Sequence, residues 1–313
     1  MVIKLYARAQ LIQKEPMTRA SYRKAMAVLI LGACIIGFAP IFVRLSSAGP
    51  AATGFWRLTF ALPLLAVLAQ RAAGQSGAVG TGLKTLPPMV AVLAGLAFAA
   101  DLSFWHYAIG FTTVANATVL SNLTPIVVTG VAWLVFKETP QRLFLAGLVL
   151  AITGAFTLAH GAASAGTGRN TGLGDALSVG TALWYAFYFL AVRKARQTLT
   201  APQVMFWSSL AAAPCLMVVA LVMHEPLLPT TSLGWAACLG LGLVHVAGQG
   251  SIAWALGRLP TAITSLVVLV QPVVAAIVGW ILFAEAIGPW QILGAALTLS
   301  GVVLAQWAAS RVQ

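Results

Sequence analysis

Charged residues are scarce in this sequence: they make up 8% of the 313 residues, against about 25% in a soluble domain. Hydrophobic residues make up 60%. This composition excludes a water-soluble globular protein, because it cannot cover a molecular surface with polar groups. Most of the outer surface must therefore face lipid, and the length of the chain sets how many times it can cross the membrane.

Acidic residues are rarer still, six in all, and they are scattered singly. An integral membrane enzyme of lipid metabolism, the alternative class, usually needs clustered carboxylates around a metal-bound phosphate, or a nucleophile beside a base. The nucleotide-binding pattern G-x-x-x-x-G-K-[ST] is absent, as are the filter loops or charged rings of a channel. We predict no enzyme activity, no catalytic residue, no metal and no cofactor.

Cysteine occurs three times, as Cys34, Cys215 and Cys238. All three lie in apolar segments, and none has the spacing of a metal ligand set. We therefore interpret them as small packing residues and predict no disulfide.

Long apolar runs are abundant. A membrane-spanning helix needs about 20 apolar residues, and the sequence offers ten such spans. They are residues 25–43, 51–70, 87–107, 113–136, 140–160, 175–195, 201–223, 233–256, 261–284 and 287–308. The predicted fold class is an all-α integral membrane protein with ten transmembrane helices.

The chain also repeats itself at long range. Six positions of the fourth and fifth spans recur 147 residues later in the ninth and tenth: Pro125, Trp133, Phe136, Glu138, Gly147 and Gly154 match Pro272, Trp280, Phe283, Glu285, Gly294 and Gly301. Five spans per half is an odd number, so the second half enters the membrane upside down, as in an inverted repeat. The predicted parts are a cytoplasmic arm (1–24), a first five-helix repeat (25–160), a linker (161–174), a second repeat (175–308) and a cytoplasmic tail (309–313).

The net charge of +12 is explained by topology rather than by a nucleic-acid partner. With the N-terminus in the cytoplasm, nearly all Lys and Arg residues fall in cytoplasmic turns or tails, whereas Arg44 and Arg169 fall outside. This asymmetry is typical of the positive-inside rule. We predict a multi-pass protein of a bacterial inner (plasma) membrane with both termini in the cytoplasm.

The repeated motifs resemble those of a known family. The blocks from Leu123-Thr124-Pro125 to Gly154 and from Val270-Gln271-Pro272 to Gly301, together with Phe55-Trp56-Arg57, resemble EamA-type members of the drug/metabolite transporter superfamily. The resemblance extends over nearly the whole chain, although Ile36-Gly37 replaces the family's usual Trp-Gly. It implies a ten-helix carrier, and family members include exporters of amino acids, aromatic ones among them.

Ionisable residues inside predicted spans are few and are functional hypotheses by default. Arg57 and Asp101 both lie about 10 Å below the outer ends of their spans, taking 1.5 Å per residue. Three interpretations stay open. Arg57 and Asp101 form a structural ion pair, or one or both contact substrate or protons, or the Arg57 side chain extends toward the membrane–water interface. A zwitterionic amino acid would need one cation and one acceptor, which Arg57 and Asp101 supply.

Other candidate substrate-binding residues are polar or aromatic. Trp105 lies on the same helical face as Asp101, Trp184 and Tyr188 are spaced i, i+4, and so are His245 and Gln249. Such aromatic faces are also common in cores and interfacial belts, and His245 is either a satisfied neutral residue or a proton carrier.

Pro125 and Pro272 lie near the middle of their spans, with Asn122 and Gln271 beside them. Each proline is predicted to kink its helix and to free the carbonyl four residues back, that of Ser121 or Val268. A freed carbonyl in hydrocarbon must face protein, water or substrate. The kinks are therefore either packed structural features or part of a site lining, with Asn122 and Gln271 as binding residues.

The sequence thus predicts a secondary transporter that moves small organic metabolites by alternating access, with export of aromatic or hydrophobic amino acids as the preferred function. A carrier of another amphipathic metabolite or drug is the alternative. Its partners are the substrate and membrane lipid, with protons as a candidate coupling ion.

Overall fold

The computed structural model describes residues 18–75, 88–111, 120–121, 123–136, 139–161, 171–283 and 288–310. This part of the chain is entirely helical, which confirms the predicted all-α class. The first half contains α2 (Arg19–Ile36), α3 (Ala39–Leu45), α4 (Pro50–Gln75), α5 (Met89–Phe111), α7 (Thr124–Phe136) and α8 (Arg142–Gly161). The second contains α9 (Thr171–Ala195), α10 (Ala201–Val222), α11 (Ser232–Val244), the π-helical turn η1 (His245–Gln249), α12 (Gly250–Leu256), α13 (Thr261–Val267), α14 (Val270–Phe283) and α15 (Pro289–Ser310).

Eight helical segments of the described chain are long and apolar enough to cross a membrane. A ninth, Arg142–Leu158, is apolar but shorter. The described part of the predicted fourth span is α7, which has 13 residues. The count of ten crossings therefore stays a prediction, as does the structure of the arm before Thr18 and of most of the linker, which lie outside the described residues.

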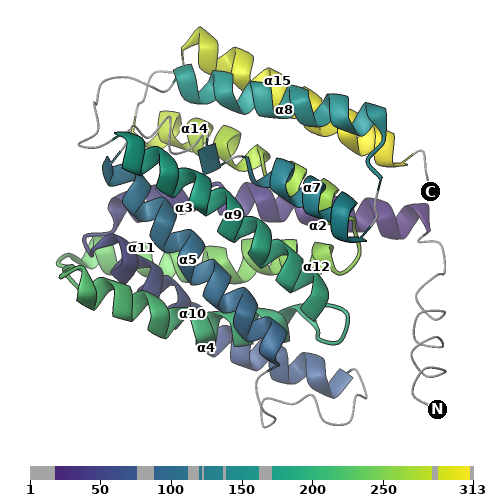
Figure 1. The fold of residues 1–313 in the computed structure, drawn as a ribbon. Coiled ribbons are helices and arrows are strands. Elements are labelled where there is room, and N and C mark those ends of the chain that lie inside the picture. The colour runs from purple at the N-terminus through teal and green to yellow at the C-terminus, as the bar shows by residue number, and fades with distance from the viewer. Residues whose placement is uncertain are drawn as a thin grey trace.

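Contacts between the two halves are reciprocal. Helix α4 packs on α10, and α8 packs on α15, so the second and fifth spans each meet their own counterpart. Helix α5 contacts α9, just as the interrupted eighth span contacts α2 and α3. Such reciprocity is what a two-fold relation between two similar units produces. Figure 1 shows α8 and α15 side by side along one edge of the molecule.

Glycines bring α8 and α15 into backbone contact. A Cβ atom on Gly154 would lie 2.3 Å from the Thr298 nitrogen, and one on Gly301 would lie 2.3 Å from the Ala151 nitrogen. At the centre of the crossing, the Thr298 hydroxyl donates to the Gly294 carbonyl at 2.8 Å and approaches the Ala151 carbonyl at 3.5 Å. Small residues at helical spacing permit this close approach in lipid, and the structure shows the packing role that the repeated glycines suggest.

Three of the predicted spans are interrupted. The first breaks at Gly37 and Phe38 between α2 and α3, and the ninth breaks at Val268 and Leu269 between α13 and α14. The eighth stays helical but widens into η1. These interruptions meet in space: a Cβ on Gly37 would lie 2.6 Å from Val274 in α14, and one on Gly248 would lie 2.7 Å from Ile36 in α2.

The two repeated prolines lie in the first turns of α7 and α14. Pro125 is the second residue of α7 and Pro272 is the third of α14, where a missing N–H is harmless. The carbonyls four residues before the prolines receive no N–H from them, and each accepts another donor within the chain. The carbonyl of Val268 accepts the backbone N–H of Gln271 at 2.9 Å, and that of Ser121 accepts the Thr124 hydroxyl at 2.9 Å. Both carbonyls are satisfied within the chain.

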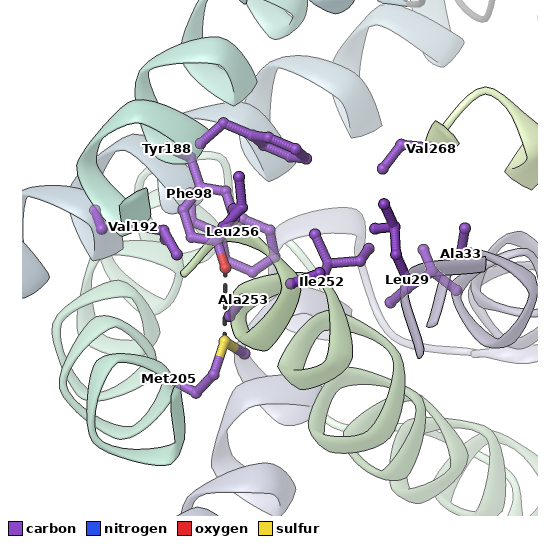
Figure 2. Packing of buried hydrophobic residues seen from close by; sticks show 14 of the residues in the cluster. Leu29, Ala33, Phe98, Tyr188, Val192, Met205, Ile252, Ala253, Leu256 and Val268 are labelled. Carbon is purple, nitrogen blue, oxygen red and sulfur yellow. Dashed lines mark hydrogen bonds between the residues drawn. The ribbon is translucent and has the colours of Figure 1, made fainter. Parts of the chain in front are cut away.

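Buried aromatic and aliphatic side chains fill the space between the two halves. Phe98 from α5, Tyr188 from α9 and Met205 from α10 meet side chains of α12 and α2 there. Figure 2 shows the Tyr188 hydroxyl directed at the Met205 sulfur, at 3.6 Å. The core therefore joins elements of both repeats.

Arg196 ties the turn after α9 to α12. Its guanidinium donates to the carbonyl of Ala253 at 3.1 Å and to that of Leu199. Burial and the nearby charge of Arg258 lower the pKa of Arg196 to about 10, so it stays charged at neutral pH. Arg258 itself lies over the Trp254 ring at 3.7 Å, which is a cation–π contact.

Helix α10 ends in a turn of left-handed backbone. His224 has a φ of 54°, and the N–H of Glu225 returns to the carbonyl of Ala220 at 2.9 Å. Helices commonly end this way, with glycine at the left-handed position. We expect His224→Gly to raise the free energy of unfolding by about 0.5–1 kcal/mol, because it removes the Cβ clash of that conformation.

Denaturant unfolding in mixed micelles measures this change. Met223→Gly is the matched control, since Met223 has an ordinary φ of −86° and should lose stability. Equal midpoints for His224→Gly and the parent protein would contradict the assignment of strain to His224.

Candidate functional site

The buried charges of the membrane-spanning region lie on neighbouring elements of the first half. Arg57 comes from α4 and Asp101 from α5, and each is 7% exposed. They are close enough to interact electrostatically, but the described residues form no direct ion pair between them, and Nε of Arg57 is buried without a hydrogen-bond partner there. Of the three interpretations of Arg57, the one in which it reaches to the interface does not fit this burial.

An aromatic group surrounds these charges. The ring of Phe98 lies 4.8 Å from that of Tyr188 and 5.4 Å from that of His245, measured between centroids. The guanidinium carbon of Arg57 lies 5.6 Å from the Phe98 centroid, within cation–π range. Tyr185 stacks on Tyr188 with centroids 5.9 Å apart. Phe98 is thus the centre of a cluster built from α5, α9 and η1.

The π-helical turn η1 contributes two buried polar side chains of the second half, His245 and Gln249. His245 is 1% exposed, and its Nε2 lies 3.0 Å from the hydroxyl of Ser209 in α10. Gln249, also 1% exposed, interacts with the hydroxyl groups of Tyr185 and Tyr188. A π-helical turn inside an α-helix is frequently found at functional sites.

Several buried polar atoms of the membrane-spanning helices have no hydrogen-bond partner among the described residues. They are Nε of Arg57, Nδ1 of His245, Nε2 of Gln249, Nε2 of Gln271 and both ring nitrogens of His106. Each such atom costs free energy unless something else fills its hydrogen-bonding capacity. Most are donors, so the arrangement suits a ligand that carries an anionic group.

The remaining predicted residues lie further from this cluster. Trp184 is 38% exposed and has Phe104 and Phe187 as ring neighbours, so the structure separates it from Tyr188, which is 1% exposed. Trp105 is half-buried, with its ring 5.2 Å from that of His106. Gln271 starts α14, and Asn122 lies outside the described residues.

Sequence reasoning did not propose Tyr185, Phe98 or Ser209 as site residues. Phe98 is on the face of Asp101 and Trp105, and Tyr185 precedes Tyr188 by three residues, so helical spacing alone could have included both. Ser209 had no such signal, because its contact with His245 joins elements 36 residues apart.

The best-formed hollows are elsewhere. One of about 320 Å³ lies between α7 and α8, lined by Ile126, Thr129, Trp133 and Leu148, and a shallower one lies on α15 beside Val303 and Trp307. Both are apolar and on outer faces, where acyl chains would fill them. The Arg57–Asp101 layer is packed between side chains in this conformation.

The helical fold, its paired halves and its buried polar layer define a polytopic membrane protein of the carrier class. Residues 23–159 and 172–307 each match the model of the EamA-like transporter family. The chain therefore belongs to that family and is a membrane transporter of small molecules built from two copies of one domain.

Comparison with solved structures gives 29 matching chains. One, titled "Crystal structure of protein", has a TM-score of 0.73 and 19% sequence identity, and the match covers 92% of this chain and 99% of that one. At this identity, the similarity shows the fold alone. No curated protein matches the sequence in a comparison with such proteins.

Proposed function

We propose that the protein is a secondary transporter that exports aromatic or hydrophobic amino acids across a bacterial inner membrane by alternating access. The observation that supports this most is the Arg57–Asp101 layer. In it, one cation and one carboxylate lie close enough to interact inside the membrane-spanning region, with no direct ion pair between them among the described residues.

Each part of a zwitterionic substrate has a candidate partner. Arg57 and the free donor of Gln249 suit the substrate carboxylate, and Asp101 suits the ammonium group. Phe98, Tyr185 and Tyr188 offer aromatic faces on which a substrate ring stacks. One ring nitrogen of His245 lies beside the Ser209 hydroxyl, and the other has no hydrogen-bond partner in the described part of the chain. His245 is therefore the candidate proton carrier.

A carrier of another amphipathic metabolite or drug is the second candidate. The same donors and aromatic faces favour any solute with one anionic group and an apolar body. The described chain holds no group of three or more His, Cys, Asp or Glu residues that would bind a metal ion, and nothing in its geometry favours an enzyme of lipid metabolism.

Counterflow in proteoliposomes tests the substrate. Vesicles preloaded with one unlabelled amino acid should accumulate the labelled form transiently, with phenylalanine, tryptophan or leucine effective and glutamate or lysine ineffective. Empty liposomes and preloading with a sugar are the controls. A carrier that shows no counterflow with any amino acid in the panel would contradict the proposed substrate, and counterflow with other organic anions would then favour the second candidate.

A further inference from the structure

The loop between α10 and α11 fastens the second half onto the first. The N–H of Gly49 donates to the Pro226 carbonyl at 2.8 Å, and Nε1 of Trp56 donates to the Leu227 carbonyl at 2.8 Å. The charge pattern of the sequence predicts that this end of the bundle faces outward. Polar contacts between the halves are therefore concentrated at one end.

Glu225 is the charged member of this contact. Its carboxylate accepts the backbone N–H groups of Ala51 at 3.2 Å and Ala52 at 3.0 Å, in the first turn of α4. A carboxylate is favoured there by the unpaired N–H groups and by the positive end of the helix dipole. Gly49 permits the approach, because a Cβ at that position would lie 2.5 Å from the Glu225 side chain.

The same carboxylate also binds a different helix. The hydroxyl of Tyr107, near the end of α5, donates to Oε1 of Glu225. Helix α4 packs mainly on α10 and α5 packs mainly on α9, and the two contact each other little. At this end of the molecule, Glu225 is thus a shared anchor that holds the two helices together.

The buried charges lie directly below this anchor on the same two helices. Arg57 follows Ala51 by six residues and Asp101 precedes Tyr107 by six, so each lies about 9 Å deeper at 1.5 Å per residue. One residue outward of Asp101, the Leu102 side chain lies 3.8 Å from the position of a Cβ on Gly54, and Leu216 of α10 lies 3.1 Å from the same position. A passage between α4 and α5 would therefore lead from Glu225 past Leu102 to Arg57 and Asp101.

We propose that Glu225 is a latch that closes this passage by holding Tyr107 of α5 against the first turn of α4. Release of the Tyr107 hydroxyl frees the end of α5 to move away from α4 and opens the Arg57–Asp101 layer to the outer solution. As a gate, the latch rests on the proposed transport function, but its opening is measurable without any substrate.

Cysteine accessibility measures the opening. Leu102→Cys is made in a protein whose three native cysteines are replaced by alanine, and it is reconstituted in nanodiscs, which expose both faces to a water-soluble maleimide. We expect slow labelling with the latch intact. Adding Tyr107→Phe, which removes one hydroxyl, should increase the rate about tenfold, as expected for loss of a hydrogen bond to a charged group. Glu225→Gln should act in the same direction.

Tyr22→Phe is the matched control, because it removes a buried tyrosine hydroxyl that has no hydrogen-bond partner among the described residues. It should leave the labelling rate unchanged. Rapid labelling with the latch intact, or equal rates with and without Tyr107→Phe, would overturn the latch. Either result would leave the counterflow test of the transport function unaffected, so the two proposals fail separately.

Discussion

Arg57→Leu should reduce amino acid counterflow about a hundredfold, the factor that corresponds to losing a hydrogen-bonded charge from the substrate site. The folded protein should be retained and should melt at the same or a higher temperature, because the substitution removes a buried cation that has no direct ion-pair partner among the described residues. Loss of activity together with retained stability distinguishes a substrate-binding residue from half of a structural pair.

Two variants make this measurement specific. Arg57→Lys keeps the charge but not the planar fork of donors, and it should recover part of the activity. Arg44→Leu removes an exposed arginine that lies over the Phe283 ring at 4.5 Å, and it should transport normally. Normal counterflow by Arg57→Leu would contradict the assignment of the substrate carboxylate to Arg57.

Gly154→Val should destabilise the protein by about 3 kcal/mol, the upper range for overpacking a tight interface. A Cβ at Gly154 would meet the backbone nitrogen of Thr298 at 2.3 Å, and backbone cannot turn aside as a flexible side chain does. Helices α8 and α15 would have to separate over their central turns. Denaturant unfolding in mixed micelles measures the loss.

Gly130→Val is the matched control, since it makes the same chemical change in α7 where no described atom lies within 4 Å of the added Cβ. It accounts for the intrinsic cost of a β-branched residue in a helix. If Gly154→Val and Gly130→Val unfold at the same denaturant concentration, the close α8–α15 contact is not a source of stability.

Composition and spacing predicted most of the fold because both depend on local chemistry. Apolar runs located the membrane-spanning helices, and the repeated glycines from Gly147 to Gly301 indicated close helix contacts, although only the structure shows that α8 and α15 contact each other. The interruptions were not predictable in the same way. The break at Val268 and the π-helical turn at His245 are stabilised by contacts with α2, far away in sequence.

The candidate site was predictable to the extent that intramembrane charge is rare. Arg57, Asp101, His245 and Gln249 were found as polar residues within apolar spans, and the structure buries all four. The aromatic residues were harder to choose, because helical spacing does not say which face of α9 points inward. Trp184 and Tyr188 share one predicted face, but the packing of α9 on α5 and its other neighbours buries the second and leaves the first partly exposed.

The α8–α15 pairing also determines the order in which the protein is assembled. Helix α8 closes the first half, whereas α15 follows every other described helix of the second half. The glycine surface of α8 is therefore uncovered in the bilayer until α15 has been synthesised. During that interval it can pair with α15 of another chain, so we expect exchange of α15 between two nascent molecules to be a route to misassembly.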